Sequence, residues 1–193
     1  MKISEGEGND EFIITRHSQF YPAINVINVY GESECRNRND EIEERFHRLL
    51  HELKKIENMG EYSVVCGDLN KHIGDLVTGN HNKVSYGGSL LRNFLKSNPS
   101  YVLLNNHETT VGGPFTRYDP SYPSEEDNKS CLDLILVSSE LSKYVKEVII
   151  DKDLMMTPFV PLSRNRKRYT DHYAILCTFE NLPLRSQTKQ SCK

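Results

Sequence analysis

The sequence lacks the features that are typical of a membrane protein, a secreted protein or a protein stabilised by a structural metal ion. Its five cysteines are scattered and form no C-x-x-C pair, so neither a zinc site nor a disulfide framework is indicated, and we expect a reducing compartment. No apolar run approaches the length of a membrane helix, and the acidic stretch from Met1 to Glu11 differs from a signal peptide. A formal net charge of -3 argues against a general nucleic-acid coat but allows a local basic patch. We therefore expect an intracellular protein, nuclear or cytoplasmic, with no membrane partner.

The composition that is present is typical of one soluble globular domain. The chain of 193 residues is long enough to form a full core, and 37% of its residues are hydrophobic and 26% charged. We expect a disordered tail over residues 1–10, one domain over residues 11–180 and a polar tail over residues 181–193.

Short apolar runs and amphipathic stretches alternate along this domain. The runs typical of strands are residues 11–16, 23–30, 62–66, 101–104, 115–117, 131–137, 145–150 and 173–179. Helical spacing predicts one helix that starts with a capping box, Asp40 with Glu43, and ends at Gly60, and a second helix over residues 89–96. Strands interleaved with helices in this proportion predict an α/β (α+β) fold of two packed sheets with helices outside.

A polar turn follows the strand that ends at Cys66. Gly67 lets the backbone bend sharply, and Asp68 and Asn70 leave on one face if the extended geometry persists. A carboxylate there can orient or deprotonate a water, and an amide can donate to a developing oxyanion. The same residue types also form ordinary turns, so this stretch alone leaves both interpretations open.

A second acidic residue, Asp133, interrupts the apolar run over residues 131–137. A buried carboxylate is costly unless it is paired, although at a strand end or on an exposed face it costs little. His172 follows Asp171 just before the last strand and is the expected partner, because a carboxylate can fix the tautomer of an imidazole and raise its pKa. Plain loop chemistry is the alternative for Asp171 and His172. Joined to Asp68, these groups would form a metal and phosphate site.

Three motifs in this order resemble the endonuclease/exonuclease/phosphatase superfamily: GDLN at residues 67–70, LDLILVS at 132–138 and TDH at 170–172. The longer text VVCGDLNKHIGD at residues 64–75 is most similar to the endonuclease domains of non-LTR retrotransposons. The resemblance runs from about Phe12 to Phe179. It implies a four-layer sandwich of two mixed β-sheets flanked by helices, and hydrolysis of a phosphoester by in-line attack of water.

The resemblance also implies roles for individual residues. Tyr30 approaches the scissile phosphate, Asp68 orients or activates the water, and Asn70 supports the phosphate oxyanion. Asp133 holds His172, which contacts the phosphate. Asp171 is the acid that binds the metal ion, and Mg²⁺ or Mn²⁺ is the expected cofactor. Thr116 lies beside the site, where it would bind the substrate.

A basic run precedes the last motif and comprises Arg164, Arg166, Lys167 and Arg168. It is either a solvated loop or a surface that lies along a nucleic-acid backbone, with DNA as the expected partner.

The superfamily also carries a metal-binding Asn and Glu on two early strands, for which this sequence has no counterpart before Glu11. We therefore expect a fold that is incomplete at its N-terminus, with uncovered strand edges that favour self-association. Three hypotheses follow. The first is a retrotransposon-type DNA endonuclease, inactive if fragmentary, from a parent that also holds a reverse transcriptase domain. The second is a non-enzymatic remnant or binding protein, and the third a phosphatase or phosphodiesterase acting on inositol phosphates or phospholipid headgroups.

Overall fold

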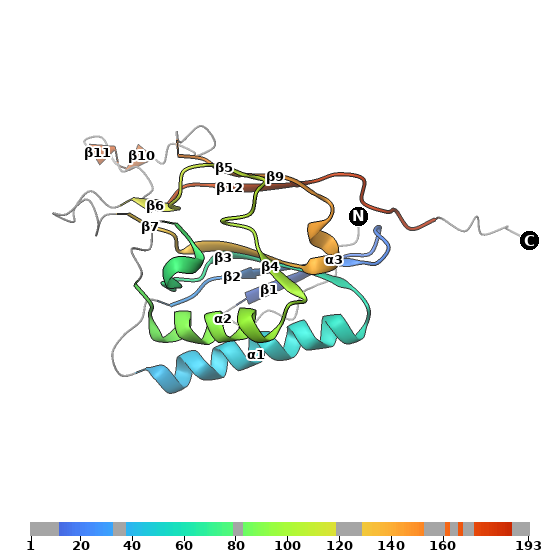
Figure 1. Ribbon diagram of the computed structural model, residues 1–193, viewed down its shortest axis with the longest axis horizontal. Coiled ribbons are helices and arrows are strands. Elements are labelled where there is room, and N and C mark those ends of the chain that lie inside the picture. Colours follow the sequence, from blue (N-terminus) through green and yellow to red (C-terminus); the bar gives the residue numbers. More distant parts are fainter. Residues whose placement is uncertain are drawn as a thin grey trace, which may run out of the picture.

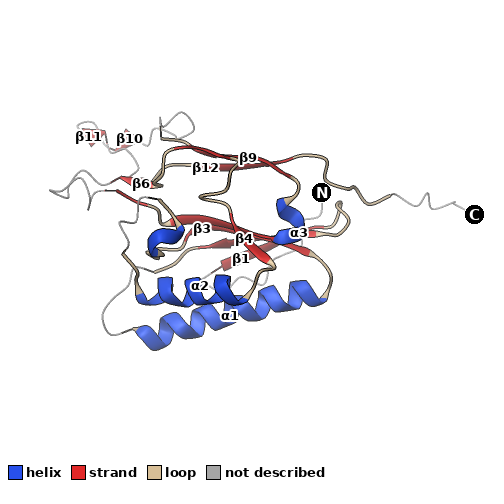
Figure 2. Ribbon diagram, viewed as in Figure 1, coloured by secondary structure: helices blue, strands red, loops and turns tan. Residues whose placement is uncertain are grey.

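The computed structural model describes residues 12–32, 38–78, 83–118, 129–152, 161–162, 166–167 and 172–186. Within them, two β-sheets lie face to face, and two long helices cover the outer face of the larger sheet (Figure 1). Figure 2 shows these layers as helices, then one sheet, then the other. No helix in the described ranges is long and apolar enough to cross a membrane.

The larger sheet has five strands in the order β1-β2-β3-β8-β4. Its strands are β1 (Phe12–His17), β2 (Ile24–Val29), β3 (Tyr62–Asp68), β8 (Asp133–Ser138) and β4 (Tyr101–Leu103). Strands β2 and β3 run parallel and the other neighbours antiparallel, so the sheet is mixed. The predicted hairpin of the first two strands is confirmed, with Phe12 opposite Val29.

The smaller sheet has three strands in the order β12-β9-β5, and it is also mixed. Its strands are β12 (Ile175–Phe179), β9 (Val145–Ile150) and β5 (Thr110–Gly112). Two short antiparallel pairs complete the strands: β6 (Arg117–Tyr118) with β7 (Lys129–Ser130), and β10 (Pro161–Leu162) with β11 (Arg166–Lys167). The predicted sandwich of two mixed sheets with helices outside is confirmed.

The helices are α1 (Asn39–Asn58), α2 (Tyr86–Ser97) and the short α3 (Ser139–Ser142), with a 3₁₀ turn, η1 (Gly74–Leu76). Helix α1 buries Leu49, Leu53 and Ile56, which recur at helical spacing. The predicted capping box at its start is wrong. The helix begins at Asn39, so Asp40 already lies in the first turn, and the N-cap residue Arg38 makes no side-chain cap bond.

Helix α2 begins at Tyr86, three residues before the predicted start. Ser85 caps it by accepting a hydrogen bond from the backbone N–H of Gly88 at 3.2 Å. Gly88 lies so close to the carbonyl oxygen of His72 that a Cβ atom would stand 1.9 Å from it. Glycine, a poor helix former, is therefore required here because the helix packs directly against the loop that follows Asn70.

Strand β8 is buried on both faces, which explains its nearly unbroken apolar run. Leu134 and Leu136 belong to the core between the five-stranded sheet and the helices. Ile135 and Val137 belong to a second core between the two sheets. Alternate residues of one strand thus serve two cores. Because side chains pack against both faces of β8, the backbone of its first residue, Asp133, has a fixed position.

Candidate active site

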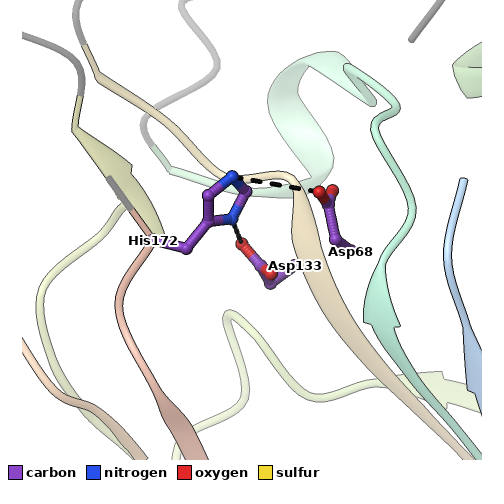
Figure 3. A group of neighbouring side chains, drawn as sticks. All are labelled: Asp68, Asp133 and His172. Atoms are coloured by element: carbon purple, nitrogen blue, oxygen red, sulfur yellow. Dashed lines mark hydrogen bonds and ion pairs between the residues drawn. The ribbon is translucent and has the colours of Figure 1, made fainter. Parts of the chain in front are cut away.

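Three polar side chains from distant parts of the chain meet at one end of the sandwich (Figure 3). Asp68 is the last residue of β3 and Asp133 the first residue of β8, and the two are directly opposite in the antiparallel register. Opposite residues project from the same face of a sheet. His172 reaches them from the segment that leads into β12, so the cluster bridges the two sheets.

Asp133 is bonded to the imidazole as the sequence predicts. Its Oδ2 lies 2.8 Å from Nδ1 of His172, and the two side chains are 17% and 29% exposed. A carboxylate can only accept, so Nδ1 carries the proton and the other ring nitrogen, Nε2, is directed towards Asp68. The pair fixes one orientation of the ring.

Asp68 lies on the far side of the same imidazole. Its Oδ2 is 3.9 Å from Nε2 of His172, which is beyond hydrogen-bonding distance, so one oxygen atom between them could contact both. Burial raises the pKa of Asp68, and the nearby charge of Asp133 raises it further. A hydrogen bond from the Asn70 backbone and the charges of His172 and Arg117 oppose this shift only in part. A carboxyl group with a raised pKa is a stronger base than an exposed one.

Asn70 contacts Asp68, but it does so from a turn and not from the extended strand that was predicted. Asn70 has a φ of 51°, so the strand does not stay extended. Its backbone N–H donates to Asp68 Oδ1 at 2.9 Å, and its Nδ2 donates to Asp68 Oδ2 at 3.2 Å and to the Gly31 carbonyl oxygen at 2.6 Å. The amide thus holds Asp68 and the end of the Tyr30–Gly31 segment together. Its contact with a phosphate oxygen stays a prediction.

The turn comes later than predicted, because the chain leaves the extended conformation at Asn70 and β3 continues through Gly67. The φ of Gly67 is 129°, and a Cβ atom at this position would lie 2.2 Å from the carbonyl oxygen of Val29. No other residue type could adopt this backbone without moving β2. Tyr30, directly after β2, is 67% exposed beside this turn, and its approach to a phosphate stays a prediction.

Thr116 lies beside the site, as the resemblance implies, and contacts Asp133 there. It is fully buried, and its hydroxyl donates to Asp133 Oδ2 at 2.7 Å. The hydroxyl oxygen of Thr116 also accepts from the backbone N–H groups of Leu132 and Asp133, each at 3.0 Å. With three hydrogen bonds inside the protein and no exposed surface, Thr116 holds Asp133 and does not touch a ligand.

The other predicted residues belong to segments of which the structure says little. Asp171, Arg164 and Arg168 lie outside the described residues, and only the backbone of Arg166 and Lys167 is described, in β11. Their predicted roles stay predictions.

Sequence reasoning missed two polar residues next to this cluster. Arg117 pairs with His172 through an isolated β-bridge, and its positive charge lowers the pKa of Asp68. Asn105, which is 6% exposed, donates to the carbonyl oxygen of Asp133. A polar residue directly after the apolar strand that ends at Leu104 was the available signal for Asn105.

The cluster also offers ligand atoms for a cation, all within 4.8 Å of one another. The two carboxylates suit Mg²⁺ or Mn²⁺, whereas Mg²⁺ rarely takes imidazole. The hydrogen bond between Asp133 and His172 already occupies one ligand atom of each. The donor set therefore offers a cation the carboxylate oxygens of Asp68 and Asp133.

The arrangement of sheets and helices is similar to that of several solved structures. A 3′ phosphatase from Neisseria, NExo, bound to a product DNA hairpin, is 21% identical, with a TM-score of 0.62 over 88% of this chain and 65% of that chain. An AP endonuclease from Archaeoglobus fulgidus is 18% identical, with a TM-score of 0.62 over 93% of this chain and 70% of that one. This chain has their fold.

A third such structure is the catalytic domain of Xenopus laevis APE2, which is 17% identical, with a TM-score of 0.66 over 92% of this chain. The present chain spans 57% of its length. Since it spans 65% and 70% of the other two, it covers only part of each of the three structures. No family model and no curated protein matches the chain. At these identities the similarity establishes the fold, and the chemistry must be argued from the site.

Proposed function

We propose that this chain is a phosphodiesterase that depends on a divalent cation and cleaves DNA, as an endonuclease of the retrotransposon type. One observation carries the proposal: His172 is held by Asp133 through Nδ1 and turns Nε2 towards Asp68. The sequence resemblance of the GDLN and TDH motifs supports it. So do the two neighbours, one solved with a DNA hairpin and the other an AP endonuclease.

His172 would bind the phosphate of the substrate. An imidazolium ring carries a proton on both nitrogens, so it could donate from Nε2 to a phosphoryl oxygen while Nδ1 stays bonded to Asp133. The negative charge on that oxygen grows as the attacking water approaches, so a donor fixed in place stabilises the transition state more than the bound substrate.

Asp68 would orient the attacking water and accept its proton. Its two oxygens are held by Asn70, so the carboxylate is fixed in direction before a substrate arrives. A divalent cation, when bound beside Asp68 and the predicted ligand Asp171, neutralises charge on the phosphate and on the leaving oxygen.

The test is cleavage of supercoiled plasmid DNA by the purified chain, with Mg²⁺ or with a chelator. We expect nicking that requires the cation and falls by about a hundredfold or more in His172→Ala and in Asp68→Ala. His107→Ala is the matched control, because His107 is a half-buried histidine whose Nδ1 bonds to Thr109 and which is not part of the cluster of Asp68, Asp133 and His172.

Three outcomes would contradict the proposal in different ways. Cleavage that persists in both site variants would mean that a contaminant or another site is responsible. A chain that ignores DNA and RNA but releases phosphate from inositol phosphates or phospholipid headgroups would keep the site and replace the substrate. A chain that binds DNA without cutting any of these compounds would be a non-enzymatic binding protein.

A further inference from the structure

A buried asparagine, Asn105, lies directly behind the end of strand β8 that carries Asp133. Strand β4 pairs with β8 from Tyr101 to Leu103, and one more bond follows, from the backbone N–H of Leu104 to the carbonyl oxygen of Ile135 at 2.8 Å. The chain then leaves the five-stranded sheet and joins the other sheet at β5. Backbone pairing from β4 therefore stops before it reaches Asp133.

The side chain of Asn105 continues this pairing where the strand has stopped. Its Oδ1 accepts from the backbone N–H of Ile135 at 3.0 Å, and its Nδ2 donates to the carbonyl oxygen of Asp133 at 2.9 Å. One partner is a backbone donor and the other a backbone acceptor, so only one orientation of the amide satisfies both. The amide supplies the acceptor and the donor that a strand residue would supply.

Burial makes these bonds hard to replace. Asn105 is 6% exposed, and Nδ2 also contacts the buried sulfur of Cys131 at 3.4 Å. Without the amide, the N–H of Ile135 would lose its acceptor, and the carbonyl oxygen of Asp133 would keep only the weak contact with Cys131 Sγ at 3.9 Å.

We propose that Asn105 is a positioning residue that holds the backbone of Asp133, so that its carboxylate meets His172. Thr116 fixes the carboxylate of Asp133 from one side, and Asn105 fixes its carbonyl group from the other. Asn105 touches no reacting atom and acts through Asp133. The link to catalysis rests on the proposed function, whereas the effect on geometry does not.

The experiment compares Asn105→Ala with Asn25→Ala by NMR of the His172 imidazole in the intact chain. Asn25 is a matched control, because it is 3% exposed in the same sheet and bonds to Glu61 and Tyr62 at the opposite end. We expect the downfield proton of the Nδ1–H···Asp133 bond in the wild type and in Asn25→Ala, and its loss or broadening in Asn105→Ala. Proton exchange at the Ile135 amide should also become faster only in Asn105→Ala.

The kinetic measurement is made on the same proteins with plasmid or oligonucleotide DNA. We expect kcat to fall by about 10- to 100-fold in Asn105→Ala, the range typical when a supporting hydrogen bond to a site residue is removed, with KM unchanged. An unchanged imidazole signal in Asn105→Ala would overturn the proposal and leave Asn105 a packing residue.

A second variant and a second readout cover the two ways in which the first could fail. If Asn105→Ala does not fold, Asn105→Ser takes its place, because its shorter side chain keeps a polar group in the buried site but cannot bond Ile135 and Asp133 as the amide does. If the wild type cuts no DNA, the proposed function fails, and the imidazole signal still decides whether Asn105 positions Asp133.

Discussion

Replacing Thr116 with valine should destabilise the fold through lost hydrogen bonds and not through packing. Valine has nearly the same shape, so packing changes little, but three hydrogen bonds disappear together. The N–H groups of Leu132 and Asp133 lose their acceptor, and the Asp133 carboxylate loses a donor. A buried donor left without a partner costs about 1–3 kcal/mol, so two of them predict a loss of about 2–6 kcal/mol.

The assay is urea unfolding followed by far-UV circular dichroism, since the sequence has no tryptophan for fluorescence. Thr15→Val is the matched control. Thr15 lies in edge strand β1 and makes one long bond, 3.5 Å from its hydroxyl to the carbonyl oxygen of Val26. We expect Thr15→Val to change the free energy of unfolding by less than about 1 kcal/mol. A similar small change in Thr116→Val would refute the reasoning that the hydroxyl is the main support of Asp133.

Two further predictions concern charge. Because the pKa of Asp68 is raised in the folded state, its ionised form destabilises the fold at neutral pH, and that cost disappears below the ordinary pKa of about 4. In chelator, the melting temperature of Asp68→Asn relative to the wild type should therefore be higher at pH 7 than at pH 4, and the reverse order would contradict the burial argument. Neutralising Arg164, Arg166, Lys167 and Arg168 should weaken DNA binding and make its salt dependence shallower, by a slope of about 0.9 for each phosphate that the protein no longer neutralises. An unchanged slope would make the run a solvated loop.

Local sequence patterns predict the elements of this fold well, because burial on one or both faces is recorded in the spacing of apolar residues. Strand β8 shows this in its continuous apolar run, and helix α1 in its stripe. The same reasoning finds Asp133 and His172, since a carboxylate in an apolar strand requires a partner.

The details that depend on register and on tertiary contact could not be predicted. Nothing local shows that Asp68 stands opposite Asp133, because the register is set by the packing of β3 against β8. Asn70 leaves the extended conformation because Gly31 and Asp68 offer acceptors for its amide, and Gly31 is distant in sequence. Asn105 looks like an ordinary polar loop residue until the fold places it against Asp133, and only the resemblance assigns Thr116 to the site.

The position of His172 makes the site sensitive to how the two sheets fit together. Asp68 and Asp133 belong to the five-stranded sheet, whereas His172 enters from the segment before β12 of the other sheet. A slide of one sheet over the other by about an ångström would break the 2.8 Å bond to Asp133 and leave every strand intact. The hydrogen bond between His172 and Asp133 therefore reports whether the two sheets are correctly aligned. Mild denaturation should abolish the site before it melts the secondary structure.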